Sequence, residues 1–426
     1  MSELSGFPSA EIEFDRDAKV VGGLDEALAL ANGPCTDVIV MSHGWNNDSR
    51  EARELYKQLA ASMRELLNQD RVPALRDRKI AIVGVIWPSK KFADAQGNPG
   101  GAAGVGSGVQ MADVTNQING LRTLYPDPES QQTLDSLVAL VPQLEDRATA
   151  RKKFADLLRS LLDKDAADDE DATTALFDTD GGELMDRLAK PLLLPGPAGG
   201  QAAGGGGAAG FGDLLKGPLG AAKKLLNFTT FFEMKARAGE IGARGVAPVV
   251  AQIKEARPEL NVHLLGHSFG ARLVSAAAKQ LPQDSVASVS LLQGAFSHHG
   301  FARDFEPGKN GFFRQIIDHK TVRGPVVITK TANDKAVGFA YAVASRISND
   351  AAAGVGDAGD KFGGIGRNGA VKTSEAVDGE LQAVGGPYAF KPRTLHNLLA
   401  DKFIADHSAV KGKEVAYAVL SAIAST

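Results

Sequence analysis

The stretch that decides the fold is NVHLLGHSFGARLVSAAAKQL, residues 261–281. It opens with a short apolar run of strand length and continues into a pattern with helical spacing. Between the two lies the motif Gly266-His267-Ser268-Phe269-Gly270, which has the form G-x-S-x-G. On a sharp turn from strand to helix, a serine is held clear of its neighbours, and the N-terminus of the helix favours negative charge. We therefore predict that Ser268 is a nucleophile rather than a surface serine in a glycine-rich turn.

Apolar runs of strand length also occur on both sides of this stretch. They are Asp37 to Met41, Lys79 to Trp87, Ser285 to Leu292 and Pro325 to Thr329. Helical spacing separates or follows these runs, most clearly over residues 48–67, 236–256 and 410–423. Strands that alternate with helices predict an α/β protein whose mostly parallel sheet is flanked by helices on both faces.

One long interval carries no strand pattern. From about Ser89 to Asn227 the chain shows helical spacing, an acidic run and a glycine-rich tract over residues 195–222, which we expect to be a loop or linker. The strand pattern resumes afterwards. We therefore predict a core made of residues 1–90 and 229–426, and a large, mainly helical and Gly-rich insertion over residues 91–228 that forms a cap or lid.

A second motif supplies candidates for binding an oxyanion. The segment Ser42-His43-Gly44-Trp45-Asn46-Asn47 directly follows an apolar run and precedes a helical pattern. At such a strand end the backbone N–H of Trp45 can face the nucleophile and act together with the N–H of Phe269. We predict an oxyanion hole formed by these two residues; the alternative is a turn with a structural tryptophan.

Together the two motifs resemble the α/β-hydrolase superfamily, specifically its bacterial serine esterase and lipase-like members. An HGW segment after an early strand, followed by GHSFG over two hundred residues later, carries the resemblance. It covers roughly residues 10–90 and 229–426, and the insertion has no part in it. The resemblance implies the α/β-hydrolase fold and the chain order nucleophile, acid, base.

That order points to particular acids and bases. Asp334 comes just past an apolar run, where its carboxylate can hold the tautomer of a histidine, and it is preferred to Asp304 and Asp318. His407 precedes the last helical pattern and matches the position of the base, whereas His396 lies in a stretch that looks helical. We predict a catalytic triad of Ser268, His407 and Asp334.

The other histidines do not suggest a metal. His298 and His299 are adjacent, no acidic or cysteine ligand accompanies them at a suitable spacing, and we expect adjacent side chains to point in different directions. We predict a loop pair that lines or flanks the site. His43 and His267, inside the two motifs, are expected to pack or hydrogen-bond, and no metal or cofactor is expected.

Composition limits the setting of the protein. The formal net charge is −4, from 47 basic and 51 acidic residues, and neither sign forms a long tail, so we expect no nucleic-acid partner. The single cysteine, Cys35, excludes an intramolecular disulfide. The first residues resemble no signal peptide and no segment has the roughly 18 apolar residues of a membrane span. A cytoplasmic location is expected, with export that uses no signal left open.

Residues 211–232 mix leucine and phenylalanine with lysine. Such a segment can cover a pocket as a lid, contact a lipid or membrane surface, or simply pack as a core helix. An apolar cover suits apolar acyl groups. The sequence therefore predicts hydrolysis of carboxylic esters, with lipid or other small apolar acyl esters as candidate substrates. The alternatives are an amidase, peptidase or acyltransferase that uses the same triad, or a non-catalytic scaffold that binds a lipid or protein.

Overall fold

A computed structural model describes residues 2–45, 47–89, 107–166, 170–192, 216–349 and 358–426. The chain divides into two compact units. The first comprises residues 1–89, 235–337 and 363–426, and the second comprises residues 90–234 and 338–362. The second unit thus includes the predicted insertion together with residues 229–234 and 338–362, which were expected in the core.

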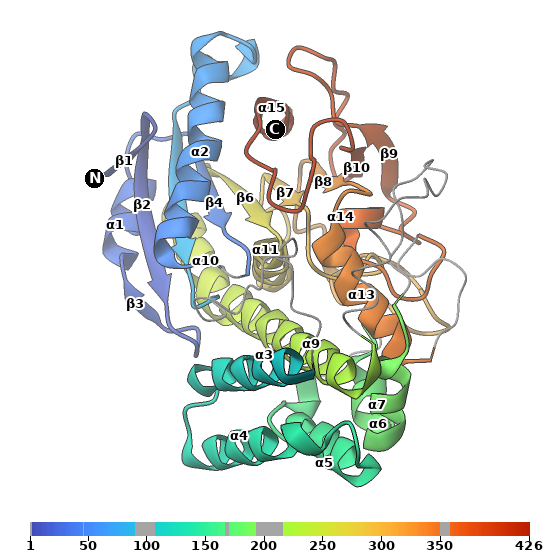
Figure 1. The fold of residues 1–426 in the computed structure, drawn as a ribbon. Helices are drawn as coiled ribbons and strands as arrows, with labels where there is room; N and C mark the ends of the chain where they lie inside the picture. Colours follow the sequence, from blue (N-terminus) through green and yellow to red (C-terminus); the bar gives the residue numbers. More distant parts are fainter. Residues whose placement is uncertain (1, 46, 90–106, 167–169, 193–215, 350–357) are drawn as a thin grey trace. The chain divides into compact units, whose positions relative to one another are not determined.

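A mixed, mostly parallel sheet forms the centre of the first unit (Figure 1). Its strand order is β1-β2-β5-β4-β6-β7-β8-β10-β9, with β3 beside β2. From β2 through to β9, each strand runs parallel to its neighbours in this order. The strands β1 and β3 both pair with β2, and these two pairs are antiparallel. The strands are β1 Ser2–Leu4, β2 Phe7–Phe14, β3 Val20–Gly22, β4 Asp37–Ser42, β5 Ile80–Ile86, β6 Asn261–His267, β7 Ser288–Leu292, β8 Val326–Lys330, β9 Ala376–Glu380 and β10 Leu395–Leu399.

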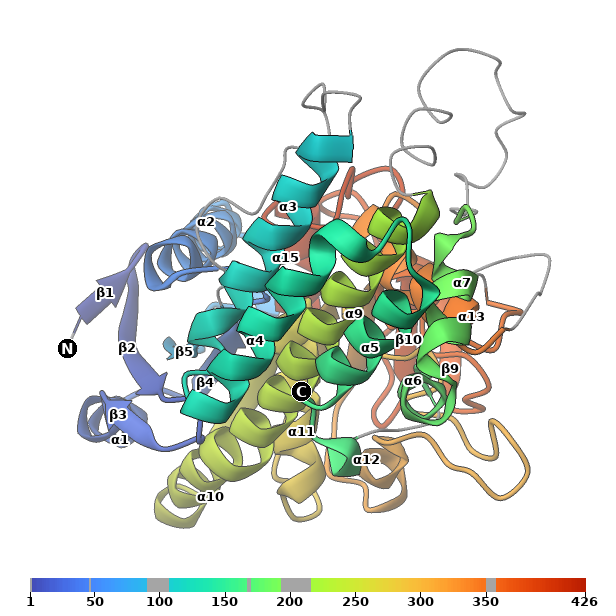
Figure 2. The same ribbon diagram turned by 60° about the horizontal axis from the view of Figure 1, so that its bottom comes forward.

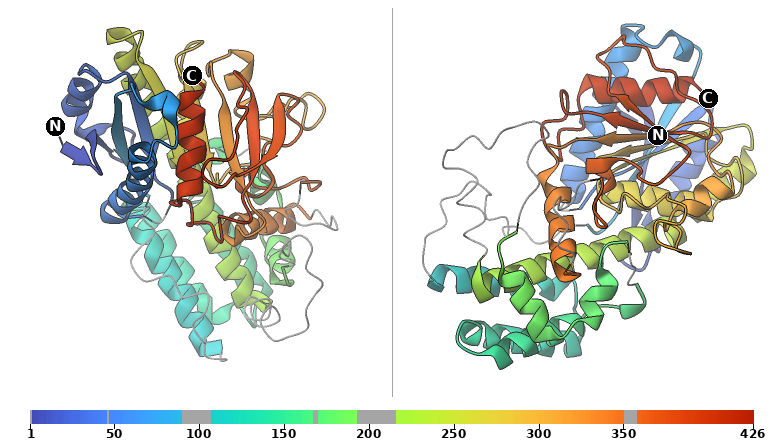
Figure 3. Two further views of the ribbon diagram at one scale, coloured as in Figure 1. Left: turned by 90° about the horizontal axis from the view of Figure 1, so that it is seen from above. Right: turned by 90° about the vertical axis from the view of Figure 1, so that its right-hand side faces the viewer.

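Helices cover both faces of this sheet, as predicted (Figure 3). The helices α2 (Ser49–Asn68) and α15 (Lys413–Ala424) pack together on one face. The helices α1 (Leu24–Ala31), α10 (Ala247–Ala256) and α11 (Phe269–Gln280) lie on the other. Because both faces are buried, β4 is fully buried along its length and carries apolar residues on both sides.

The start of α2 shows how local sequence sets a boundary. Asp48 is the N-cap, and its carboxylate accepts a hydrogen bond from the backbone N–H of Glu51 at 2.8 Å. The side chain of Glu51 accepts one from the N–H of Asp48, also at 2.8 Å. This capping box satisfies two backbone donors that the first turn leaves without helical partners. The helix therefore begins at Ser49, directly after its N-cap residue.

The described part of the second unit is helical. It contains α3 (Ser107–Gly120), α4 (Pro128–Leu140), α5 (Ala148–Arg159), α6 (Thr173–Asp178) and α7 (Gly181–Ala189), and α3, α4 and α5 lie side by side (Figure 2). It also contains most of α9 (Gly217–Glu240) and of α13 (Lys335–Ile347), two helices that continue into the first unit.

Part of the tract predicted as a linker is helical. Residues 193–215 lie outside the described residues, but α9 begins at Gly217, so the loop prediction for 217–222 is wrong. Leu219, Ala221 and Ala222 are buried there, and their packing outweighs the low helix propensity of the glycines.

Within residues 211–232, the two lysines of α9 have partners in their own unit. Lys224 is buried, and its Nζ donates to the carbonyls of Leu188 and Lys190 at 2.7 and 2.8 Å. Burial lowers the pKa of Lys224 to about 8. Lys223 donates to Asp113 at 3.0 Å. These are contacts of packed residues, and a role at a lipid surface stays a prediction.

Several elements differ from the sequence prediction. The N-terminal strands β1 to β3 and the late strands β9 and β10 have no counterpart in it. His396, expected in a helix, lies in β10, which hydrogen-bonds to β8 on one side and to β9 on the other. A run of only five residues cannot separate the two periodicities, so tertiary pairing decides the outcome.

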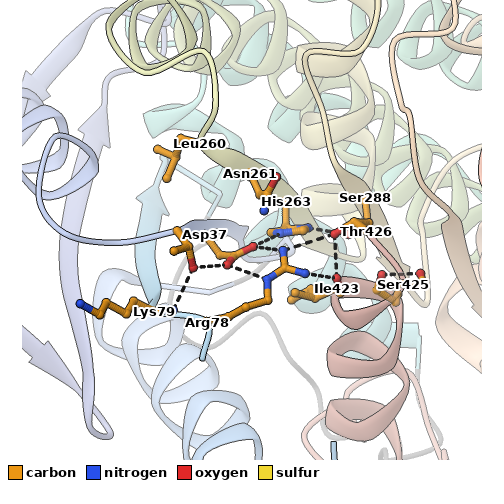
Figure 4. A network of polar contacts seen from close by, with 12 residues as sticks. Asp37, Arg78, Lys79, Leu260, Asn261, His263, Ser288, Ile423, Ser425 and Thr426 are labelled. Atoms are coloured by element: carbon orange, nitrogen blue, oxygen red, sulfur yellow. Dashed lines mark hydrogen bonds and ion pairs between the residues drawn. The ribbon is translucent and has the colours of Figure 1, made fainter. Parts of the chain in front are cut away.

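A buried polar network ties the amino ends of three central strands to α15 (Figure 4). Arg78 Nε donates to Asp37 Oδ2 at 2.8 Å, and Arg78 Nη1 donates to the carbonyl of Ile423 at 2.9 Å. His263 donates from Nε2 to Asp37 Oδ1 at 3.0 Å and accepts from Ser288 Oγ at 2.8 Å. Burial alone would raise the pKa of Asp37, but the hydrogen bonds from His263 and Arg78 hold it below its usual range.

We predict that Arg78→Met destabilises the fold by about 3 kcal/mol, because it leaves the buried Asp37 carboxylate without its cation. Arg53→Met is the matched control: its partner is Glu11 and both side chains are half exposed, so its cost is about 0 to 1 kcal/mol. Urea unfolding of the two variants measures the difference. Equal destabilisation would show that the network adds nothing beyond an ordinary surface ion pair.

Among the described residues, no helix is long and apolar enough to span a membrane.

Candidate active site

Ser268 lies on the turn between β6 and α11, at the carboxyl edge of the sheet. Its φ is 57° and its ψ is −123°, a left-handed conformation that non-glycine residues rarely adopt. The turn is possible because its neighbours lack side chains. A Cβ on Gly266 would lie 2.2 Å from the carbonyl oxygen of Gly270, and one on Gly270 would lie 2.2 Å from that of Ser42. The glycines of the motif are therefore required sterically.

Three residues far apart in the sequence form a continuous chain of hydrogen bonds. The Ser268 hydroxyl donates to His407 Nε2 at 2.8 Å, and His407 Nδ1 donates to Asp334 Oδ2 at 2.8 Å. Because the carboxylate can only accept, it fixes the proton on Nδ1 and leaves Nε2 as the acceptor. Asp334 is fully buried, Ser268 is 5% exposed and the His407 side chain 21% exposed, so the imidazole has the most access to solvent. The structure thus brings the three predicted residues together.

The Asp334 carboxylate has further partners. Its Oδ1 accepts from the backbone N–H of Val337 at 3.0 Å, in the first turn of α13, where the helix dipole favours a negative charge. Its Oδ2 also accepts from Gln293 Nε2 at 3.1 Å. Because Val337 and Gln293 are both buried, these donors hold the carboxylate in one orientation toward His407.

Hydrogen bonds join the loops that carry Asp334 and His407. Asp401 accepts from the Thr331 hydroxyl at 2.7 Å and from the backbone N–H of Ala332 at 3.0 Å. Asn333 Nδ2 donates to the carbonyls of Asp401 and Ile404 at 3.1 and 2.9 Å. These contacts join the end of β8 to the segment that leads to His407, so the two loops keep a fixed spacing.

The HGW segment lies against Ser268. A Cβ on Gly44 would be 2.6 Å from the Cβ of Ser268 and 3.1 Å from its Oγ, so only glycine fits there. The next residue, Trp45, packs its ring against that of Phe269 with 6.1 Å between the ring centroids. Of the two residues proposed for the oxyanion hole, Phe269 follows Ser268 in the chain and Trp45 follows the glycine that approaches Ser268. The assignment of their N–H groups to an oxyanion stays a prediction, and Asn46 lies outside the described residues.

His43 contacts the backbone of the HGW segment and the residues that surround it. Its ring stacks on Trp87 at 5.4 Å between centroids, its Nδ1 donates to the carbonyl of Gly44 at 3.0 Å, and its backbone N–H donates to the Tyr56 hydroxyl at 2.8 Å. Burial lowers the pKa of His43 to about 4, so the ring is neutral at pH 7. These contacts give His43 the packing and hydrogen-bonding role expected from the sequence.

His267, the residue before Ser268, holds the backbone of His407 in a similar way. Its Nε2 donates to the backbone carbonyl of His407 at 2.8 Å, and the two rings lie 5.1 Å apart between centroids. Burial, assisted by the adjacent His407, lowers the pKa of His267 to about 3. A neutral His267 thus fixes the backbone of His407.

The competing residues lie elsewhere. Asp318, at the end of α12 (Arg314–Asp318), pairs with Arg303 and Arg314, and Asp304 is an exposed residue with φ 49°. His396 Nε2 accepts from the backbone N–H of Lys391 at 3.1 Å. None of the interactions described for these residues reaches Ser268.

His298 and His299 contradict the expectation that adjacent side chains diverge. Both are buried, and their Nε2 atoms meet at 3.1 Å. His298 also contacts Asn368, and His299 stacks on Phe305. Outside a regular strand, backbone bending can turn two consecutive side chains toward one another. Among the described residues no group of three or more His, Cys, Asp or Glu could hold a metal ion.

Ser288, His263 and Asp37 form a second hydrogen-bonded chain of the same residue types. Its setting is different, because Ser288 belongs to the regular strand β7 and is 1% exposed. No sharp turn presents its hydroxyl, and Arg78 already binds the carboxylate. The chain around Ser268 alone combines the contacts with a strained turn and a partly exposed imidazole.

Comparison with protein-family models, with curated proteins and with solved structures finds no significant match for this chain.

The buried histidines predict a stability profile. Burial lowers the pKa of His43 to about 4, of His267 to about 3 and of His299 to about 4, from an ordinary value of 6.5. Below pH 6.5 the unfolded chain takes up protons that the folded protein does not. The free energy of unfolding should therefore fall as the pH is lowered from about 6.5 to 4.5, each residue contributing up to about 1.4 kcal/mol per pH unit.

Urea unfolding at several pH values measures this slope. His299→Gln should flatten it, because one of the three groups is removed. A free energy of unfolding that is constant over this range would contradict the prediction.

Proposed function

We propose that this protein is a serine hydrolase of the α/β-hydrolase fold that cleaves carboxylic esters. The observation that carries the proposal is the chain of hydrogen bonds from Ser268 to His407 and from His407 to Asp334, each 2.8 Å long. Acyl transfer needs a nucleophile, a base and a group that orients the base, and these three residues meet each need. The strained turn at Ser268 and the parallel sheet, whose carboxyl edge carries all three, support the fold assignment.

The acylation step follows from the donors and acceptors. His407 Nε2 accepts the Ser268 proton while Oγ attacks the ester carbonyl, and the Asp334 carboxylate stabilises the imidazolium that forms. His407 then gives the proton to the leaving alcohol, and the carbonyl re-forms as an acyl ester on Ser268. Water repeats the sequence on this ester, with His407 as base, and releases the acid.

The tetrahedral intermediate carries a negative charge that needs donors. The backbone N–H of Phe269, at the start of α11, and that of Trp45 are proposed to supply them. Support comes from the closeness of Gly44 to Ser268, which places the HGW backbone against the nucleophile. The N-terminus of α11 adds a favourable dipole.

We further propose that the insertion, residues 91–228, selects the acyl group of the substrate. Its leucine and phenylalanine content is the support, since an apolar cover favours apolar chains. A series of aryl esters of increasing chain length measures this selection. The proposal expects kcat/KM to rise with chain length up to a limit, and a flat series would remove the insertion from the account of specificity.

We predict that a fluorophosphonate probe labels the wild-type protein covalently, because the probe reacts with an activated serine. Ser268→Ala should abolish labelling and His407→Ala should slow it by roughly 10³-fold or more. Labelling is read by intact-protein mass spectrometry beside an esterase of known activity. An unlabelled wild type would exclude the catalytic proposal, and full labelling of Ser268→Ala would exclude this nucleophile.

Three asparagine substitutions test the acid. Asp334→Asn should lower the labelling rate by roughly 10³- to 10⁴-fold, because the histidine loses the partner that fixes its tautomer. Asp304→Asn and Asp318→Asn are matched controls of the same chemical change and should label at the wild-type rate. A loss confined to either control would place the acid elsewhere.

Gly44→Ala tests the fit of the HGW segment. The added methyl group would lie 2.6 Å from the Ser268 Cβ, closer than real contacts allow, so the loop must move away from the nucleophile. We expect labelling to be at least roughly 10²-fold slower, the size seen when one oxyanion donor is lost. Gly22→Ala is the control, because a Cβ there meets nothing within 4 Å. Equal labelling of the two variants would contradict the role of this segment.

A further inference from the structure

One residue links the nucleophile to the acid without belonging to the triad. Gln293 directly follows β7, is fully buried and has φ 46°, a left-handed conformation that a long side chain adopts only when its surroundings require it. Its backbone N–H donates to the Thr329 hydroxyl at 3.0 Å, which fastens it to the neighbouring strand β8.

The backbone on both sides of Gln293 holds Ser268. The N–H of Ser268 donates to the carbonyl of Leu292 at 3.0 Å, and the N–H of Ala295 donates to the carbonyl of Ser268 at 3.1 Å. The segment 292–295 therefore hydrogen-bonds to the N–H and to the carbonyl of Ser268, through Leu292 before Gln293 and through Ala295 after it. Any shift of this segment moves the nucleophile with it.

The side chain of Gln293 reaches the acid from the same place. Its Nε2 donates to Asp334 Oδ2 at 3.1 Å and to the carbonyl of Gly366 at 2.9 Å. Because a carboxylate and a carbonyl can only accept, the amide nitrogen is the atom that faces them. Asp334 Oδ2 is also the oxygen that accepts from His407, so Gln293 and His407 share one acceptor atom.

We propose that Gln293 is a positioning residue that sets the spacing between Ser268 and Asp334 and tunes the carboxylate for His407. The proposal rests on the proposed function. The imidazole of His407 must reach both Ser268 Oγ and Asp334 Oδ2, each at 2.8 Å. Gln293 lies in the segment that hydrogen-bonds to Ser268, and its side chain contacts Asp334. The hydrogen bond that it donates also withdraws negative charge from Oδ2. The carboxylate therefore attracts the Nδ1 proton of His407 less strongly.

The decisive variant is Gln293→Met, which keeps the length of the side chain and removes the donor. Gly366 retains a donor, since the N–H of Thr331 also reaches its carbonyl at 2.9 Å. Asp334 Oδ2 loses one of its two partners. We expect fluorophosphonate labelling and ester kcat to fall roughly 10- to 100-fold, the effect of losing one buried hydrogen bond to a charged group. KM should change little.

The pH profile separates positioning from a general loss of structure. With less charge drawn from Oδ2, the imidazolium form of His407 is favoured, so the acidic limb of the labelling rate should move to higher pH in Gln293→Met. Asn397→Leu is the matched control. It also removes a buried amide with two hydrogen bonds to backbone, both to Ala370, and should leave the acidic limb unchanged.

Gln293→Glu supplies a second reading if Gln293→Met does not fold. A protonated glutamic acid can donate to Asp334 as the amide does, whereas its carboxylate cannot, so labelling should approach the wild-type rate at low pH and fall as the pH rises. A profile parallel to that of the wild type overturns the proposal.

Two results for Gln293→Met would also contradict the positioning role. A wild-type rate in Gln293→Met, or a slower rate with an unmoved acidic limb, also overturns it. An unlabelled wild-type protein instead overturns the proposed function, so failure of one proposal is separable from failure of the other.

Discussion

The close approach of three backbone segments around Ser268 is the constraint on which the rest of the site depends. Glycines at 44, 266 and 270 let the ends of β4 and β6 and the start of α11 approach to distances at which a Cβ would collide with its neighbours. This packing compels the left-handed turn and places the hydroxyl at the carboxyl edge of the sheet. In a parallel sheet the carboxyl ends of neighbouring strands lie at the same edge, so Asp334 and His407, which follow β8 and β10 in the chain, also reach that edge.

The comparison of two similar constellations shows what residue types alone leave undecided. Ser288, His263 and Asp37 are joined by hydrogen bonds of 2.8 and 3.0 Å, close to the 2.8 Å of both bonds among Ser268, His407 and Asp334. At the amino ends of the strands, however, the serine is part of a regular strand and the carboxylate neutralises Arg78. The same residue types thus belong to a buried ion-pair network at one edge of the sheet, while at the other they surround a strained turn, where we propose that they act in catalysis.

The sequence predicts those parts of the structure whose causes are local. The strand, turn and helix around Ser268, the capping box at Asp48 and the alternation of β4 to β8 with helices each depend on a few consecutive residues. The late strand β10 does not, because five residues fit either period and only pairing with β8 and β9 settles their conformation. Contacts between side chains that are far apart in the sequence are harder still to predict. Nothing in the letters around Gln293 signals that it meets Asp334, 41 residues later.

The three residues of the proposed triad could be chosen from the sequence because the chain order of the superfamily that it resembles, together with the ends of the apolar runs, narrows the candidates. Their supporting partners depend on tertiary contacts. The most direct test of the central claim is to quench the reaction with a short-chain aryl ester in acid and map the acyl group by peptide mass spectrometry. The expected result is an acyl group on the peptide that contains Ser268, formed and lost at rates compatible with turnover and missing from Ser268→Ala. Ester hydrolysis at the wild-type rate by Ser268→Ala, or turnover without any acyl group on that peptide, would contradict it.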